Sequence, residues 1–83
     1  MRILYFAWVR EQIGVSEEEV APPAEVTTVE ALVGWLADRD EQHAAAFANR
    51  RRLRAAVDGV FAGLDASIAG AREVAIFPPV TGG

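Results

Sequence analysis

Only one long amphipathic helical pattern occurs in this chain of 83 residues, and segments typical of strands lie before and after it. Its start, at Thr27 to Glu30, fits a capping box, and the helix is expected to end at about Asp38. A single stripe of this length can cover one face of one sheet. The apolar residues that recur at helical spacing and form the stripe are Val29, Leu32, Val33 and Leu36.

The strand-like segments are rich in aromatic and branched side chains. Between two of them stands the dipeptide Asp58-Gly59, which favours a tight hairpin. The last segment ends at Pro78 and Pro79, because proline cannot donate a hydrogen bond to a neighbouring strand. The predicted strands are residues 2–9, 15–21, 53–57, 60–62 and 73–77.

The order of these elements predicts an α+β fold. Residues 10–14 are expected to be a turn that joins the first two strands as an antiparallel pair, and residues 41–49 a second, shorter helix. We interpret the acidic run Glu17, Glu18 and Glu19 as a solvated sheet edge. The β-grasp arrangement fits best: a mixed sheet covered on one face by the main helix, with the first and last strands side by side.

Composition excludes several classes of function. The formal net charge of −4 argues against binding of nucleic acid as the main activity. The chain has no cysteine, which excludes disulfides, thiolate catalysis and metal sites built on cysteine. No apolar run approaches the ~20 residues that a membrane span needs, and the N-terminal apolar run lacks a cleavage site. We therefore expect a cytoplasmic protein that binds neither membranes nor nucleic acid.

The sequence offers two polar candidates for a binding or catalytic site, a single histidine and a cluster of arginines. His43 is the single histidine, and without a cysteine or second histidine it cannot form a usual zinc site. We interpret it as a solvent-facing helical residue, and no metal site is predicted. A basic cluster is interpreted as a solvated loop leading into a strand, with a docking patch for an acidic partner as the alternative: Arg50, Arg51, Arg52 and Arg54.

The C-terminal segment has physical properties that suit insertion into another protein. Pro78 and Pro79 fix φ, so the chain should leave the sheet stiff and extended, and the four residues beyond can project roughly 13 Å. Gly82 and Gly83 carry no side chains, so the terminal carboxylate can enter a narrow channel. A frayed terminus is the alternative. We expect a β-grasp domain over residues 1–77 and an extended, flexible tail over residues 78–83.

The sequence resembles the small, sulfur-carrier subunits of molybdopterin synthase, a ubiquitin-like family. The likeness extends over nearly the whole chain. Residues 71–74 are Ala-Arg-Glu-Val where many relatives carry Gly-Asp-Glu-Val, a difference expected to alter only a turn. The matching segments are Leu4-Tyr5-Phe6-Ala7, Arg10-Glu11 with Gly14, Thr28-Val29-Glu30-Ala31-Leu32, Ala55-Ala56-Val57-Asp58-Gly59 and Val74-Ala75-Ile76-Phe77-Pro78-Pro79-Val80-Thr81-Gly82-Gly83.

The resemblance implies that an ATP-using, E1-like enzyme adenylates the Gly83 carboxylate and that a sulfur donor system converts it to a thiocarboxylate. The loaded tail would enter the large synthase subunit, where the catalytic residues are expected, and give its sulfur to cyclic pyranopterin monophosphate. The family assembles as a heterotetramer, and no permanently bound cofactor is implied.

The other site residues follow from the same resemblance. We expect an apolar docking surface on the sheet face away from the main helix, formed by Phe6, Phe61 and Phe77. Ordinary core packing is the alternative for these aromatic residues. The tail is expected to be guided by Pro78, Pro79, Val80, Thr81 and Gly82.

Three other functions stay open. A sulfur carrier could serve thiamine, cysteine or tRNA thiolation, against which the Phe-Pro-Pro-Val segment argues. A ubiquitin-like modifier that is conjugated to other proteins through Gly83 is the second alternative. Because this protein has no lysine, it cannot form branched polymers by conjugation to further copies of itself. A pure interaction module would bind its partners equally well without Gly82 and Gly83. An autonomous enzyme is least favoured, because no catalytic constellation is visible.

Overall fold

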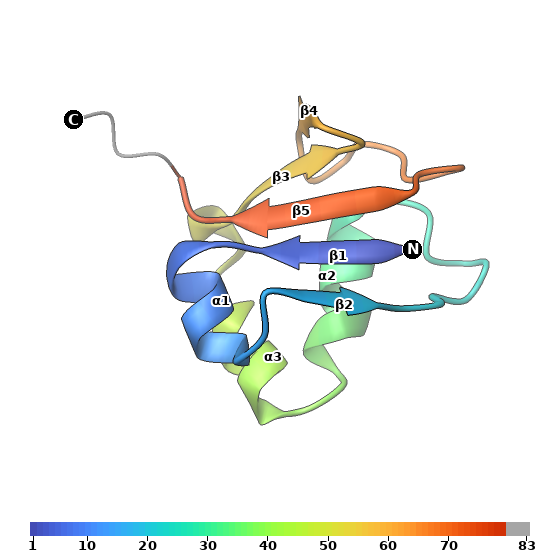
Figure 1. Cartoon of the computed structure of the whole chain (residues 1–83). Coiled ribbons are helices and arrows are strands. Elements are labelled where there is room, and N and C mark those ends of the chain that lie inside the picture. The colour runs from blue at the N-terminus through green and yellow to red at the C-terminus, as the bar shows by residue number, and fades with distance from the viewer. Residues whose placement is uncertain (80–83) are drawn as a thin grey trace.

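The computed structural model describes residues 1–79 of the chain. These residues form one sheet with helices on one side of it (Figure 1). No helix among them is long and apolar enough to cross a membrane. The elements in chain order are β1 (Arg2–Tyr5), α1 (Ala7–Ile13), β2 (Glu17–Glu19), α2 (Val29–Ala37), α3 (Glu41–Ala46), the 3-10 turn η1 (Arg50–Arg52), β3 (Arg54–Val57), β4 (Val60–Ala62) and β5 (Glu73–Phe77).

The sheet is mixed, with the strand order β2-β1-β5-β3-β4. Its two longest-range neighbours, β1 and β5, pair in parallel, with Ile3 opposite Val74 and Tyr5 opposite Ile76. The other three pairings are antiparallel. The predicted α+β, β-grasp arrangement, with the first and last strands side by side, is confirmed.

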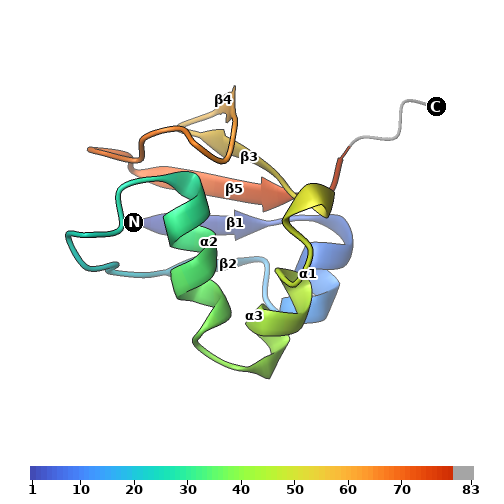
Figure 2. The same ribbon diagram turned by 180° about the vertical axis from the view of Figure 1, so that it is seen from behind.

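The helices lie against one face of the sheet, as the view from behind shows (Figure 2). The predicted stripe of α2 is buried in a core with the inward side chains of β1 and β5, including Ile3 and Val74. The helix begins where expected, because the Thr28 hydroxyl accepts a hydrogen bond from the Ala31 N–H at 3.1 Å. Among residues 1–79, no helix covers the opposite face of the sheet (Figure 1).

The hairpin between β3 and β4 forms at the predicted dipeptide. Asp58 has φ 49° and Gly59 has φ 82°, which are the positive angles that the favoured two-residue hairpin turn requires. The Asp58 carboxylate also accepts hydrogen bonds from the N–H groups of Arg72 and Glu73 at 2.9 and 3.0 Å. The turn therefore fixes the start of β5 as well as the register of the hairpin.

The prediction of a strand over residues 2–9 followed by a turn is wrong beyond Tyr5. The chain leaves the sheet at Phe6, and residues 7–13 form α1, which packs against α3. Val9 and Ile13, four residues apart, are buried on the inner side of this helix. Gly14, at φ 98°, ends it and donates its N–H to the Arg10 carbonyl oxygen at 2.8 Å.

The second predicted helix is confirmed as α3, although it ends at Ala46. Asp40 begins it, because its carboxylate accepts a hydrogen bond from the His43 N–H at 2.8 Å. Phe47, directly after the helix, is fully buried. The helix packs against both α1 and α2, on the same side of the sheet (Figure 2).

The N-terminus lies at the end of the sheet opposite to the end at which β5 leads into Pro78 (Figure 1). The Met1 ammonium donates a hydrogen bond to the Val20 carbonyl oxygen at 2.9 Å and lies 3.3 Å from a Glu19 carboxylate oxygen. This separation follows from the parallel pairing of β1 and β5. The division into a domain over residues 1–77 and a tail over residues 78–83 stays a prediction.

Candidate functional site

The helix-free face of the sheet carries an apolar row that crosses four strands. Residues directly opposite each other in a sheet point to the same face. The strand registers place Leu4 opposite Ala75, Ala75 opposite Ala56, and Ala56 opposite Phe61. A continuous row of small and apolar side chains therefore leads from β1 to the exposed aromatic ring on β4.

Phe61 and Phe77 form an aromatic pair on this face. Their ring centroids are 5.9 Å apart with an interplanar angle of 56°, which is a favourable packing distance. Phe61 is nevertheless 81% exposed, and Phe77 is half-buried. Together with Arg54, Ala55, Ala62 and Gly63 they line a shallow hollow. An exposed aromatic pair beside a hollow is typical of a surface that another protein covers.

Phe6 lies at the end of the same face. It is 46% exposed and is one residue beyond the Tyr5–Ile76 pair of the ladder, as Phe77 is on the neighbouring strand. Its extended backbone, with φ −132° and ψ 157°, continues the alternation that places Leu4 outward. The structure thus brings two of the three predicted docking residues into contact and places the third at the adjoining strand end.

The root of the expected tail is flanked by two elements that are distant in sequence. The Arg52 guanidinium carbon lies 4.9 Å from the centre of the Trp8 ring, in a cation–π contact. These two side chains line a hollow with Pro78 and Pro79. The remaining predicted tail residues lie outside the described part of the chain: Val80, Thr81, Gly82 and Gly83.

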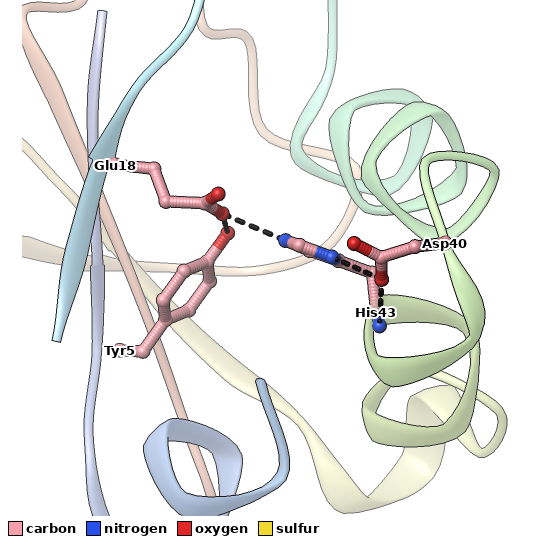
Figure 3. Close-up of polar contacts among 4 residues, drawn as sticks. All are labelled: Tyr5, Glu18, Asp40 and His43. Atoms are coloured by element: carbon pink, nitrogen blue, oxygen red, sulfur yellow. Dashed lines mark hydrogen bonds and ion pairs between the residues drawn. The ribbon is translucent and has the colours of Figure 1, made fainter. Parts of the chain in front are cut away.

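A buried polar cluster joins α3 to the edge of the sheet (Figure 3). The two ring nitrogens of His43 lie 2.7 Å from an Asp40 carboxylate oxygen and 2.7 Å from a Glu18 carboxylate oxygen. The same Glu18 oxygen accepts the Tyr5 hydroxyl at 2.7 Å. Since His43 is only 4% exposed, its interpretation as a solvent-facing residue is wrong. Glu18 also turns inward, so the solvated-edge interpretation fails for that member of the acidic run.

The geometry favours a protonated His43 ring. Each ring nitrogen faces a carboxylate oxygen, which accepts hydrogen bonds, and only the protonated ring can donate from both nitrogens. Burial disfavours the charged ring, but the hydrogen bonds to Glu18 and Asp40 outweigh it and raise the pKa of His43 above its usual value.

The partners of His43 shift in complementary directions. Burial alone would raise the pKa of Glu18, but hydrogen bonds from Tyr5 and His43, together with the nearby charges of His43 and Arg39, lower it overall. Hydrogen bonds from the His43 backbone and ring lower the pKa of Asp40. Burial and the hydrogen bond to Glu18 raise the pKa of Tyr5. The cluster is therefore an ionic network in which both His43 ring nitrogens and the Tyr5 hydroxyl have a hydrogen-bond partner, and it links α3 to β1 and β2.

This arrangement predicts a pH dependence of folding stability. A raised histidine pKa stabilises the fold below the unfolded value of about 6.5 and loses that contribution as pH rises through the folded pKa. Lowered carboxylate pKa values stabilise above about pH 4 and lose their contribution on acidification. The contribution of the cluster should therefore be largest between about pH 5 and 6.5.

The check is urea denaturation of the wild type and His43→Ala across pH 4–9. We expect the variant to lose about 2 kcal/mol at pH 6, because hydrogen bonds to charged groups contribute on this scale. The difference between the two proteins should shrink as pH rises above 6.5. A difference that is constant from pH 5 to 9 would contradict the assignment of a protonated ring.

Sequence reasoning missed both the ionic cluster and the contact between Trp8 and Arg52. Within residues 1–79, no group of three or more histidine, cysteine or acidic side chains is placed to hold a metal ion. The cluster has a structural explanation in the contacts described above. The candidate functional site is therefore the helix-free face, with the Phe61–Phe77 pair and the chain leaving β5 beside it.

Known proteins match this chain over essentially its full length. A family model described as the ThiS family matches residues 3–83. A molybdopterin synthase sulfur carrier subunit from Escherichia coli (strain K12) is 41% identical over 83 residues, covering 100% of this chain and 99% of that protein. A protein of the same name from Haemophilus influenzae is 32% identical over 83 residues, with the same coverage. The crystal structure of SAMP1 from Haloferax volcanii matches with a TM-score of 0.72 and 26% identity, covering 100% of this chain and 98% of that one.

Proposed function

The chain belongs to the ThiS family, and from this membership we propose that it is the sulfur carrier subunit of a molybdopterin synthase. The observation that carries the proposal is the 41% identity, over the full length, to the Escherichia coli subunit of that name. The resemblance drawn from the sequence is thereby confirmed. The chain serves as a sulfur-donating subunit and is no enzyme on its own.

The proposed chemistry takes place at the Gly83 carboxylate. A carboxylate oxygen attacks the α-phosphorus of ATP on an activating enzyme, and pyrophosphate leaves. A donor system then supplies sulfur at the oxidation level of hydrosulfide. This sulfur attacks the acyl carbon, the C–O bond to AMP breaks, AMP leaves with the electron pair of that bond, and a thiocarboxylate remains. Glycine suits this position because no side chain hinders either attack.

The second half of the cycle uses the large synthase subunit. The thiocarboxylate sulfur attacks a carbon of the cyclic pyranopterin monophosphate bound there, and a C–O bond of that carbon breaks. Water then hydrolyses the resulting thioester, which leaves the sulfur on the pterin and returns the free carboxylate. Catalytic side chains and the substrate pocket belong to that partner, in an assembly with two small and two large subunits. The carrier itself holds no permanent cofactor, and ATP is used by the activating enzyme in the cytoplasm.

The described residues support a docking role for the helix-free face. Exposed Phe61, its neighbour Phe77 and the adjoining Phe6 would form the apolar centre of the contact with the large subunit. Residues 78–82 would then guide Gly83 into the partner. In this arrangement the sheet supplies the binding energy and the tail supplies the reacting atom.

The proposal is tested by intact mass spectrometry of the purified chain. After incubation with the activating enzyme of its host, ATP and a sulfur source, we expect the mass gain that replaces one oxygen by one sulfur, confined to the C-terminal peptide. Omitting ATP should abolish the gain. No gain with a competent enzyme would overturn the carrier function in favour of an interaction module.

The destination of the sulfur is a separate measurement. The loaded chain, mixed with the large subunit and cyclic pyranopterin monophosphate, should return to its unloaded mass as sulfur appears in the pterin. Sulfur loading without transfer to the pterin would instead favour a sulfur carrier for thiamine, cysteine or tRNA thiolation. Covalent adducts of the chain with other proteins would instead indicate a modifier.

A further inference from the structure

Four arginines gather at the end of the sheet from which the chain continues into Pro78. Three of them form η1, and the fourth opens β3 after the buried residue Leu53. They carry four of the eight positive charges in a chain whose net charge is −4. We refer to them as the arginine patch, which consists of Arg50, Arg51, Arg52 and Arg54.

Contacts within the chain orient this patch without neutralising it. Arg54 Nη1 donates to the carbonyl oxygens of Arg51 and Leu53 at 3.1 and 2.8 Å. Arg50 donates to the carbonyl oxygen of Phe47, and Arg52 stacks on Trp8. Among residues 1–79, no carboxylate forms a salt bridge with any of the four. Carbonyl and ring contacts leave a full positive charge on each guanidinium, so the patch stays available for an external anion.

The surroundings of the patch connect it to both parts of the candidate site. One hollow is lined by Arg50, Arg51, Leu53 and Arg54, and Arg54 also lines the hollow that holds Phe61 and Phe77. Arg52 lines the hollow beside Pro78 and Pro79. No described carboxylate lines any of these three hollows.

At the opposite end of the sheet, arginines lie beside carboxylates. There Arg2 pairs with the Glu73 carboxylate at 3.2 Å, and the local hollow contains Asp58 and Glu73 beside Arg2 and Arg72. Positive charge at that end is balanced by the acids of the same chain. Of the two ends of the sheet, the one from which the chain continues into Pro78 therefore carries the unbalanced positive charge.

We propose that the arginine patch is an electrostatic docking site for an acidic surface on the large synthase subunit. The patch would lie at the rim of the contact, and Phe61 and Phe77 would lie at its centre. This inference rests on the proposed function. Its support is continuity: Arg54 borders the same hollow as the aromatic pair, and protein interfaces surround an apolar core with a polar rim. Charges at such a rim act mainly by accelerating association. At physiological salt their attraction extends over a Debye length of about 8 Å.

The test measures the association rate constant with the purified large subunit by stopped-flow mixing, at low and at physiological salt. Arg51→Glu is compared with Arg72→Glu, because both side chains are exposed and both variants change the net charge equally. At low salt we expect Arg51→Glu to slow association several-fold and R51E/R54E to slow it about tenfold or more, with a weaker salt dependence than the wild type. Arg72→Glu should stay within about twofold of the wild type, because Arg72 lies at the opposite end of the sheet, outside the contact and its rim.

The possible outcomes separate this inference from the proposed function. Equal slowing by Arg51→Glu and Arg72→Glu would assign the effect to net charge and overturn the patch. Unchanged association in R51E/R54E, with the wild type still binding and loading sulfur, would overturn the patch alone. Slower sulfur loading with unchanged binding to the large subunit would assign the patch to the activating enzyme and overturn the choice of partner. A wild type that neither loads nor binds would overturn the proposed function itself.

Discussion

Deleting Gly83 is expected to abolish sulfur loading while leaving the fold intact. The deletion moves the terminal carboxylate back along the chain by about 3.5 Å, whereas a misplacement of about 1 Å in an active site already costs a hundredfold in rate. The fold should not respond, because the last strand ends at Phe77. The measurement is the C-terminal mass gain after incubation with activating enzyme and ATP, beside a thermal melt.

Two further variants make this result specific. Val60→Ala changes an exposed residue outside the tail and keeps the chain length and both glycines, so it should load at close to the wild-type level. Gly83→Val keeps the position of the carboxylate but adds a branched side chain, so its loading reports whether clearance matters as well as reach. Normal loading of the chain that lacks Gly83 would contradict the assignment of the reacting carboxylate.

Phe61→Asp is expected to weaken binding to the large subunit by about a hundredfold. A buried aromatic residue at the centre of an interface commonly contributes ~2–4 kcal/mol, and a hundredfold change in affinity corresponds to about 2.7 kcal/mol. The substitution also places a charge in the proposed apolar contact. Because Phe61 is 81% exposed in the isolated chain, the fold should be retained, and calorimetric titration would measure the loss directly.

The neighbouring residue provides a matched control. Val60 is 68% exposed on the same strand, but alternation directs it away from the face that carries Phe61. Val60→Asp introduces the same charge one position away and should bind nearly as well as the wild type. The docking assignment would fail if both variants lost affinity equally, or if Phe77→Ala loosened the fold but left binding unchanged.

Local signals in the sequence were sufficient for the parts of the fold that local chemistry decides. Thr28 caps α2, and Asp58-Gly59 turns the chain between β3 and β4, because each residue suits its backbone conformation or its nearest neighbours. The placement of the first and last strands side by side followed from the β-grasp arrangement that the order of these elements favours. The apolar stripe of α2 likewise needs only helical spacing to be recognised.

The errors arose where contacts between distant segments decide the structure. Residues 6–9 are good strand formers, yet packing of α1 on α3 takes them out of the sheet. The spacing of Val9 and Ile13, followed by Gly14, is the signal that could have identified this helix. His43 bonds to Glu18, 25 positions away, and no pattern around either residue foretells that contact. The reactivity of Gly83, by contrast, is inferred from chemistry and resemblance, because geometry within this chain does not determine it.

The parallel pairing of β1 with β5 has a chemical consequence for an activated chain. An acyl adenylate reacts with primary amines, and self-acylation would consume the carrier. The chain has no lysine, so none of its side chains carries a primary amine. The Met1 amine lies at the far end of the sheet from Pro78, where it donates a hydrogen bond to the Val20 carbonyl oxygen and lies beside the Glu19 carboxylate. In the proposed cycle, the fold would thus keep this amine away from the activated end and leave the acyl group for the sulfur donor.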